Sequence, residues 1–191
     1  MSKEQTLKKI RELPIPDIFI GTPDYTEIPL KMDKVFRNNQ IWGEIITILR
    51  NEGTLSSRGK SLFFAQNIMV LTEGPIQFFI NLIIYTLVKS EHHDIYDPRT
   101  ERFVYSLEDI SDIILAIKIK FLKTHGFDYF EVVCAKDIRN AVAHQNIEIE
   151  ENGTLITNKK RKYGLEKLAS ISDNSYAFLH DIFKIIEQNT A

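Results

Sequence analysis

The sequence has a single cysteine, Cys134, and few of the residues that interrupt regular structure, with 8 glycines and 6 prolines among 191 residues. One cysteine cannot form an internal disulfide or a thiolate metal cage by itself, so zinc fingers and disulfide-rich scaffolds are excluded. Positive charge is not in excess, since the formal net charge is -2, and any contact with a nucleic acid must therefore be local. This composition suits a reducing compartment, and we expect a cytoplasmic protein.

Long apolar runs are also lacking. The most apolar stretch, residues 76–88, has roughly half the length that a membrane-spanning helix needs, and Gln77 and Asn81 interrupt it. Residues 1–12 carry lysines and acids with no apolar stretch behind them, so a secretory signal is not expected. We interpret residues 76–88 as a core helix and expect no membrane partner.

What is present is helical periodicity. Residues 13–30 hold four of the six prolines and are expected to be extended. Apolar residues then recur at spacings of three and four, which predicts an amphipathic helix from Met32 to Arg50 that ends near residues 51–53. Residues 56–90 start from serine caps and are apolar almost all round, so a helix there needs partners on several sides, which favours a homodimer. Pro75 should kink or divide this helix.

The second half of the chain continues this pattern around one turn signal. Asn152 and Gly153 tolerate the backbone angles of a tight turn, and alternating residues flank them, so we predict a small β-hairpin there. The fold class is predicted to be all-α, an antiparallel helical bundle with this hairpin inserted before the last helix. The other predicted segments are a polar loop at residues 91–102, helices at residues 106–126 and 127–144, and a final helical region at residues 165–186 with a break at residues 172–174.

Residues 136–144, with the sequence KDIRNAVAH, carry the chemistry-bearing side chains. On a helix, at about 100° per residue, Lys136, Asp137, Asn140 and His144 lie on one polar stripe, where Asn140 and His144 can share a hydrogen bond. Arg139 falls at the margin of the apolar face, where a guanidinium needs an acidic partner, either a carboxylate or a phosphate. Imidazole exchanges protons near neutral pH and arginine clamps phosphates, so the pair suffices to cleave RNA through its own 2′-hydroxyl without a metal.

Arg139, the polar Asn140 directly after it, and His144 four residues further on resemble the Rx4-6H motif of the HEPN superfamily, helical domains found in bacterial and archaeal defence systems and toxins. The resemblance assigns residues 59–191 to a HEPN-like helical domain and leaves residues 1–58 as an N-terminal extension with one amphipathic helix. It implies that Arg139 and His144 are catalytic and that Asn140 supports them. It also implies a homodimer with a composite site that cuts RNA without metal or cofactor, leaving a 2′,3′-cyclic phosphate and a 5′-hydroxyl.

A structural reading of the motif stays open beside this one. Arg139 could pair with Asp137, Glu131 or an acid on a facing helix while His144 merely ends its helix.

HEPN toxins controlled by a nucleotidyltransferase antitoxin usually carry a tyrosine two residues after the motif histidine, where this chain has Asn146. The sequence therefore argues against control through that tyrosine, and leaves room for a separate antitoxin or defence-system partner.

Cations elsewhere are secondary candidates for RNA binding. Lys136 lies on the polar stripe of the motif, and the run Lys159-Lys160-Arg161-Lys162 follows the predicted hairpin, where it is either an RNA contact or a charged loop. His92, His93 and Asp94 are interpreted as a solvated loop rather than metal ligands, because no second cluster accompanies them. Cys134 and the phenylalanines are interpreted as core, the latter being Phe63, Phe64, Phe78 and Phe79.

The sequence thus predicts a metal-independent endoribonuclease of HEPN type that acts as a toxin or antiviral defence component. The alternatives are a non-catalytic HEPN-like module that binds RNA, a nucleotide or a protein partner, and a structural helical subunit.

Overall fold

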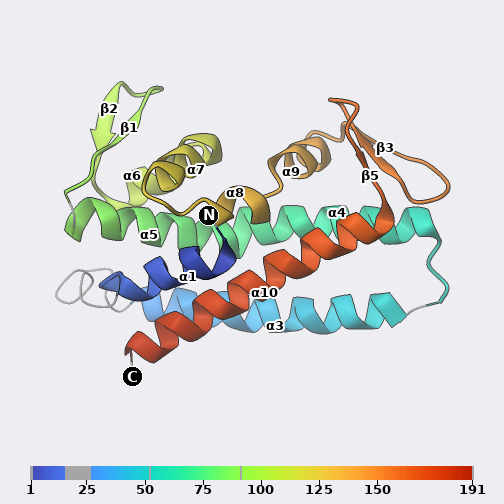
Figure 1. The fold of residues 1–191 in the computed structure, drawn as a ribbon, viewed down its shortest axis with the longest axis horizontal. Helices are drawn as coiled ribbons and strands as arrows, with labels where there is room; N and C mark the ends of the chain where they lie inside the picture. The colour runs from blue at the N-terminus through green and yellow to red at the C-terminus, as the bar shows by residue number, and fades with distance from the viewer. Residues whose placement is uncertain (1, 16–26, 52, 91, 191) are drawn as a thin grey trace. The chain divides into compact units, whose positions relative to one another are not determined.

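Most of the described chain is helical (Figure 1). The computed structural model describes residues 2–15, 27–51, 53–90 and 92–190. A π-helical turn, η2 (Thr72–Ile76), joins two of the helices, and short strands form two small antiparallel sheets. The helices are α1 (Lys3–Glu12), α3 (Glu27–Asn51), α4 (Ser57–Leu71), α5 (Gln77–Ser90), α6 (Leu107–Asp112), α7 (Leu115–Thr124), α8 (Tyr129–Val133), α9 (Lys136–Ala143) and α10 (Leu165–Thr190), and the strands are β1 (Ile95–Asp97), β2 (Arg102–Val104), β3 (Ile147–Ile149), β4 (Leu155–Thr157) and β5 (Lys162–Tyr163).

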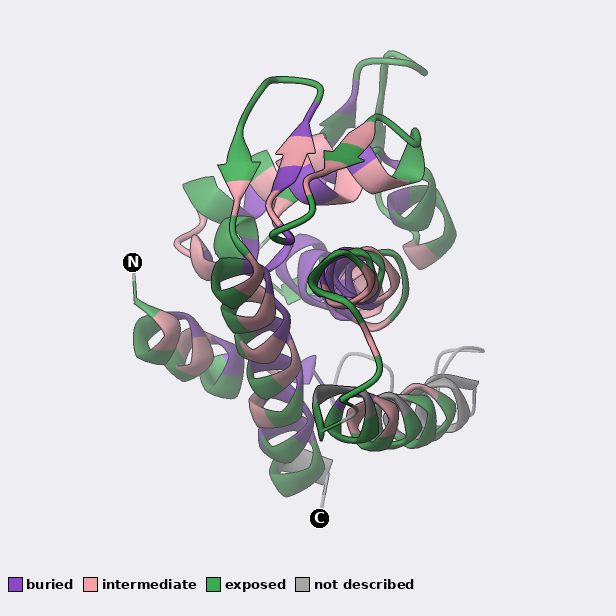
Figure 2. Ribbon diagram, turned by 90° about the vertical axis from the view of Figure 1, so that its right-hand side faces the viewer, coloured by how far each residue is buried: buried purple, intermediate pink, exposed green. Residues whose placement is uncertain are grey.

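The chain divides into two units. The first unit lies within residues 1–32, 76–132 and 180–191, and the second within residues 33–75 and 133–179. α10 contributes its residues up to Leu179 to the second unit and the remainder to the first. Figure 2 shows α10 buried along one side and exposed along the other, which is the amphipathic pattern of its sequence.

α5 forms the core of the first unit. Nearly all of its side chains from Phe79 to Val88 are buried, as its continuous apolar sequence predicts, and α6 and α7 pack against it. The rings of Phe79 and Phe183 meet edge to face with their centroids 4.9 Å apart, so the end of α10 packs on α5. An ion pair between Lys3 and Asp181, 2.6 Å long, joins α1 to α10.

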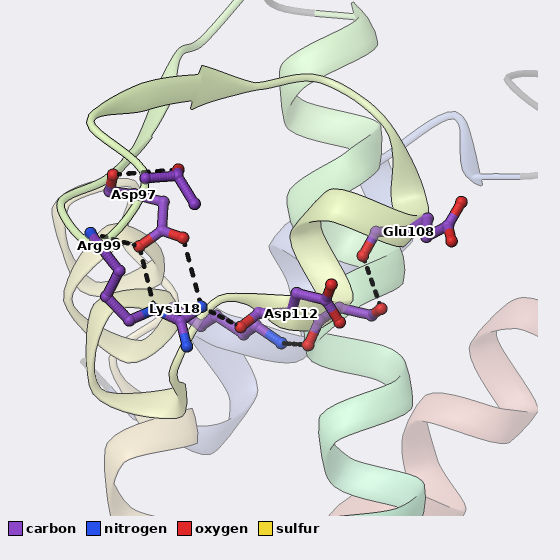
Figure 3. Close-up of polar contacts among 7 residues, drawn as sticks. Asp97, Arg99, Glu108, Asp112 and Lys118 are labelled. Carbon is purple, nitrogen blue, oxygen red and sulfur yellow. Dashed lines mark hydrogen bonds and ion pairs between the residues drawn. The ribbon is translucent and has the colours of Figure 1, made fainter.

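A polar network holds the hairpin of β1 and β2 in the first unit (Figure 3). Asp97 is buried and accepts hydrogen bonds from the backbone N–H of Arg99 at 3.0 Å and from its guanidinium at 3.3 Å. Arg99 also donates to the carbonyl oxygen of Asp112, at the end of α6. Lys118 of α7 is fully buried and donates to the carbonyl oxygen of Ser111 at 2.8 Å, which ties α7 to α6.

The second unit is built on α4 and α9, which pack against each other. A three-stranded antiparallel sheet in the order β3-β4-β5 lies beside them, with Ile147 opposite Thr157 and Leu155 opposite Tyr163. Apolar side chains from these elements and from α10 make one core, whose buried members are Phe64, Ala65, Ile68, Ile138, Leu155 and Leu168.

Several predictions about the elements are confirmed. The chain is mostly helical, with a hairpin before the final helix, although the two sheets make it less than purely all-α. α3 ends at Asn51, η2 divides the long apolar helix at Pro75, and Gly153 takes a positive φ of 85° in the β3–β4 turn. The hairpin is extended to three strands, because Lys162, the last residue of the basic run, forms β5 together with Tyr163.

Other predictions are wrong at the ends of elements. α3 begins at Glu27, so residues 27–30 are helical rather than extended, and the rest of that expectation falls partly on residues 16–26, outside the described residues. The predicted loop at residues 91–102 forms β1 and most of its hairpin. Strands of three residues give too short an alternation to be read from the sequence. α1 was not predicted at all.

Two predicted helices are each divided in two. Residues 106–126 form α6 and α7, separated at Ile113, which is extended and almost completely buried. Residues 127–144 form α8 and α9, separated at Ala135, whose left-handed φ of 39° no α-helix can contain. α10, in contrast, has no break at residues 172–174. Its buried Ser172 accepts a 2.6 Å hydrogen bond from the side-chain amide of Asn67, so the polar residue is satisfied inside the helix.

The continuous helical stretch Ser57–Ser90 is long and apolar enough to cross a membrane, judged by length and composition alone. In the structure, 61% of its most apolar 18-residue window is buried. A core helix of a water-soluble protein meets the same two criteria, so the absence of a membrane partner stays a prediction.

Candidate functional site

α9 carries the motif and is positioned by its apolar side. Ile138 and Ala141 are buried against the second unit's core, and the intervening residues therefore face away from it. Arg139 and Asn140 are partly exposed, and Lys136 and His144 are exposed. The predicted polar stripe is thus present, on a helix of only eight residues.

Arg139 has two side-chain partners. Its Nε and Nη2 atoms both contact Oε1 of Glu73, in the π-helical turn η2, and its Nη1 donates to Oδ1 of Asn140 at 2.7 Å. Each guanidinium nitrogen is therefore engaged at least once. Asn140 supports Arg139 through this bond, whereas the sequence suggested that its side chain would orient His144.

Glu73 reaches Arg139 because two unusual backbone features meet in the second unit. The wide turn of η2 contains Pro75, and the left-handed Ala135 starts α9 abruptly after Cys134. The hydroxyl of Thr72 donates to the carbonyl oxygen of Cys134 at 3.4 Å, which holds the π turn against the start of the motif helix. π turns and left-handed non-glycine residues are frequent at functional sites, and here a hydrogen bond joins the π turn to the residue before left-handed Ala135, next to the motif helix.

His144 is the C-cap of α9. Its backbone N–H bonds the carbonyl oxygens of Asn140 and Val142, and its φ of -97° and ψ of 8° end the helix. Its side chain is exposed, so the imidazole is accessible to a ligand and to water. The structure thus places His144 at the end of the motif helix and joins it to Asn140 through the backbone.

Part of the basic run lies beside the motif. Lys159 contacts Oδ1 of Asp137 at 3.3 Å, and Arg161 contacts Oδ2 of the same carboxylate. Asp137 is in the first turn of α9, two residues before Arg139, so these cations and the motif share one region of the second unit. Lys160 is exposed, while Lys162 of β5 pairs at 3.3 Å with Glu150, the residue directly after β3.

The other candidates are structural. Cys134 is buried, and this burial raises the pKa of its thiol to about 12, so it is no nucleophile at neutral pH. Phe64 and Phe79 are buried and Phe63 and Phe78 half-buried in edge-to-face ring pairs, as core residues are. In the part of the chain that is described, no group of three His, Cys, Asp or Glu side chains is placed to hold a metal.

Sequence reasoning did not single out Glu73. One signal was available, because Glu73 is the only acid between residues 53 and 90, directly before the Gly-Pro pair that interrupts the apolar helix. A lone carboxylate in such a stretch calls for a cationic partner. The comparisons with known proteins add no identification, since no family model, no curated protein and no solved structure matches the chain.

Proposed function

We propose that this chain is a metal-independent endoribonuclease of HEPN type. The observation that carries the proposal is the arrangement around α9, where Arg139 and Asn140 lie on the helix, an exposed His144 caps its C-terminal end, and Lys159 and Arg161 are held beside it. Guanidinium and ammonium groups bind phosphates, and an exposed imidazole transfers protons, so the region has the groups that RNA cleavage requires.

In the proposed reaction, the RNA itself supplies the nucleophile. Arg139 binds the scissile phosphate and offsets the charge that develops on it. His144 acts as general base on the 2′-hydroxyl or as general acid on the departing 5′-oxygen, and a second copy of the chain supplies the complementary imidazole in a composite site. The 2′-oxygen bonds to phosphorus as the bond to the 5′-oxygen breaks, which leaves a 2′,3′-cyclic phosphate and a 5′-hydroxyl. No cofactor enters this scheme.

The proposed setting rests on the resemblance to HEPN domains alone. There the chain is a cytoplasmic homodimer that serves as a toxin or antiviral defence component, with an antitoxin or another defence-system protein as its partner. Lys136, Lys160 and Lys162 extend the RNA contact beyond the two cations held by Asp137.

The test is cleavage of an end-labelled mixed-sequence RNA by the purified chain in excess EDTA. We expect the wild type to cut and His144→Ala or Arg139→Ala to lower the rate by about 10²-fold or more, which is the usual contribution of one acid–base or oxyanion-stabilising group. His180→Ala is the matched control, because His180 is also exposed but lies on α10. Thermal midpoints should be nearly equal for all four proteins.

A second function is favoured by a specific observation. Arg139 is already paired with a carboxylate and His144 ends its helix, which favours a non-catalytic role, either as a HEPN-like module that binds RNA, a nucleotide or a protein, or as a structural helical subunit. In the same assay this module would bind the labelled RNA and release no 2′,3′-cyclic product. Loss of folding in His144→Ala would instead identify the histidine as structural.

A further inference from the structure

Glu73 occupies the part of Arg139 that a phosphate would use. A guanidinium has two edges, and each edge carries two parallel N–H groups. The Nε and Nη2 atoms of Arg139 form one of these edges, and such an edge binds two oxygens of a phosphate or a carboxylate. Both atoms are engaged by one oxygen of Glu73, and Nη1 is engaged by Asn140. An RNA phosphate that is to take this edge must therefore replace the carboxylate.

The ion pair is accessible to such a competitor. The side chain of Arg139 is 24% exposed and that of Glu73 is 40% exposed, so water reaches both groups. Ion pairs of this exposure contribute little to stability, because solvent screens them. A phosphate can therefore displace the carboxylate from Arg139.

The backbone around Glu73 leaves room for this exchange. The next residue, Gly74, is exposed, and a Cβ built on it would meet no atom within 4 Å. Pro75 has no N–H to lose, and the buried anchor on this side of the turn is Thr72, one residue before Glu73. The carboxylate can move away from Arg139 while Thr72 stays in place.

We propose that Glu73 is an intramolecular competitor of RNA, a carboxylate that holds Arg139 in the place of a phosphate and must be displaced when RNA binds. The proposal rests on the proposed function for its ligand, a single-stranded RNA phosphate. It makes Glu73 a residue that sets the affinity for RNA, without contact with the reacting atoms.

The test measures binding separately from cleavage. The probe is a short fluorescein-labelled 2′-O-methyl RNA of mixed sequence, which has the phosphates of RNA but no nucleophilic hydroxyl. Glu73→Gln keeps the shape of the side chain and removes its charge, so we expect binding about two- to fivefold tighter than wild type, the equivalent of one partly exposed ion pair. Glu151→Gln, an exposed acid in the β3–β4 turn, is the matched control for the change in net charge and should alter the affinity less.

A double-mutant cycle makes the result specific to Arg139. In an Arg139→Ala background, Glu73→Gln should leave the affinity unchanged, because no guanidinium remains to be released. In cleavage of ordinary RNA, Glu73→Gln should lower KM by the same factor and leave kcat unchanged. If Glu73→Gln has a lower thermal midpoint than the wild type, the RNA affinity, KM and kcat are measured on Glu73→Ala instead.

Equal gains in Glu73→Gln and Glu151→Gln, or a gain that persists without Arg139, would overturn the proposal. So would a loss of kcat in Glu73→Gln, which would make the glutamate a positioning residue for Arg139. If the wild type cleaves RNA but Glu73→Gln does not raise the affinity, only the role of Glu73 as a competitor is refuted. If the wild type binds RNA without cleaving it and Glu73→Gln binds more tightly, only the ribonuclease activity is refuted. If no variant binds RNA, both proposals are refuted.

Discussion

Asp97 is a buried carboxylate whose charge depends on one neighbour. The Arg99 side chain and backbone N–H hold the pKa of this carboxyl below its usual range by hydrogen bonding, against the opposing effect of burial. A carboxyl whose pKa is lower in the folded than in the unfolded protein stabilises the fold at any pH above the unfolded pKa, which is about 3.9 for aspartate. This stabilisation is lost as the pH falls through the pKa of the folded protein.

Asp97→Asn should therefore lower the free energy of unfolding at pH 7, and the difference from wild type should shrink progressively below about pH 4. Thermal or urea unfolding between neutral and acidic pH measures this difference. Glu101→Gln, in the same hairpin but exposed, is the control for the loss of one acid and should lower the free energy of unfolding at pH 7 less than Asp97→Asn does. If the difference in unfolding free energy between Asp97→Asn and wild type stays constant into strong acid, the interaction with Arg99 does not depend on the charge of Asp97.

Single residues also show how far the site was predictable. The 3.6-residue period placed Arg139 and Asn140 on one helix and His144 at its end, since these relations are local. The sequence suggested Asp137, Glu131 or an acid on a facing helix as the carboxylate partner of Arg139, and the partner is instead Glu73. Glu73 is 66 residues away, and the chain fold alone brings it to Arg139. Asp137 likewise pairs with Lys159 and Arg161, which are more than 20 residues away. The spacing of apolar residues does not predict such a long-range contact.

The β3–β4 hairpin is anchored at its turn. Gly153 has a φ of 85°, and the hydroxyl of Ser61 in α4 donates to its carbonyl oxygen. A Cβ built on Gly153 would lie 2.9 Å from the carbonyl oxygen of Ser57, a backbone atom that cannot easily retreat. Both the backbone angle and the space therefore require glycine.

Gly153→Ala should cost about 1–3 kcal/mol of unfolding free energy, through strain at a positive φ and the contact with α4. Gly164→Ala is the matched control, since no atom lies within 4 Å of its Cβ position, and its effect should stay within about 0.5 kcal/mol. Chemical denaturation of the two variants and wild type gives the comparison. Equal stability of all three would show that the turn moves freely on α4.

Among whole elements, the long helices and the interruption at Pro75 were predictable, whereas the breaks without proline were not. α3 and α10 have enough turns for an apolar face to show in the sequence, and α4 and α5 are apolar almost all round. The breaks at Ile113 and Ala135 carry no glycine or proline, and tertiary packing of their buried neighbours decides them. The same holds for β1 and β2, whose three-residue strands are fixed by Asp97 and Arg99 rather than by alternation.

For the molecule as a whole, the oligomeric state is the property on which the proposed reaction depends. A composite site with two imidazoles needs two copies of the chain, so we expect a homodimer. Sedimentation equilibrium at micromolar concentration should give twice the mass of the chain for wild type, Arg139→Ala and His144→Ala alike. A monomer that cleaves RNA at full rate would rule out the composite site and leave one His144 to serve both proton transfers.

α10 completes both units, and this has a consequence for how the protein is made. Leu168, Phe178 and Leu179 belong to the core of the second unit, and Ile182, Phe183 and Ile186 to that of the first. The ribosome adds about 5–20 residues per second, so the nascent chain exposes the apolar α4 and α5 for several seconds before their last packing partner is synthesised. Neither unit can therefore finish folding before α10 has been synthesised, and a chain that terminates before this helix would leave both cores open to aggregation and to cellular proteases.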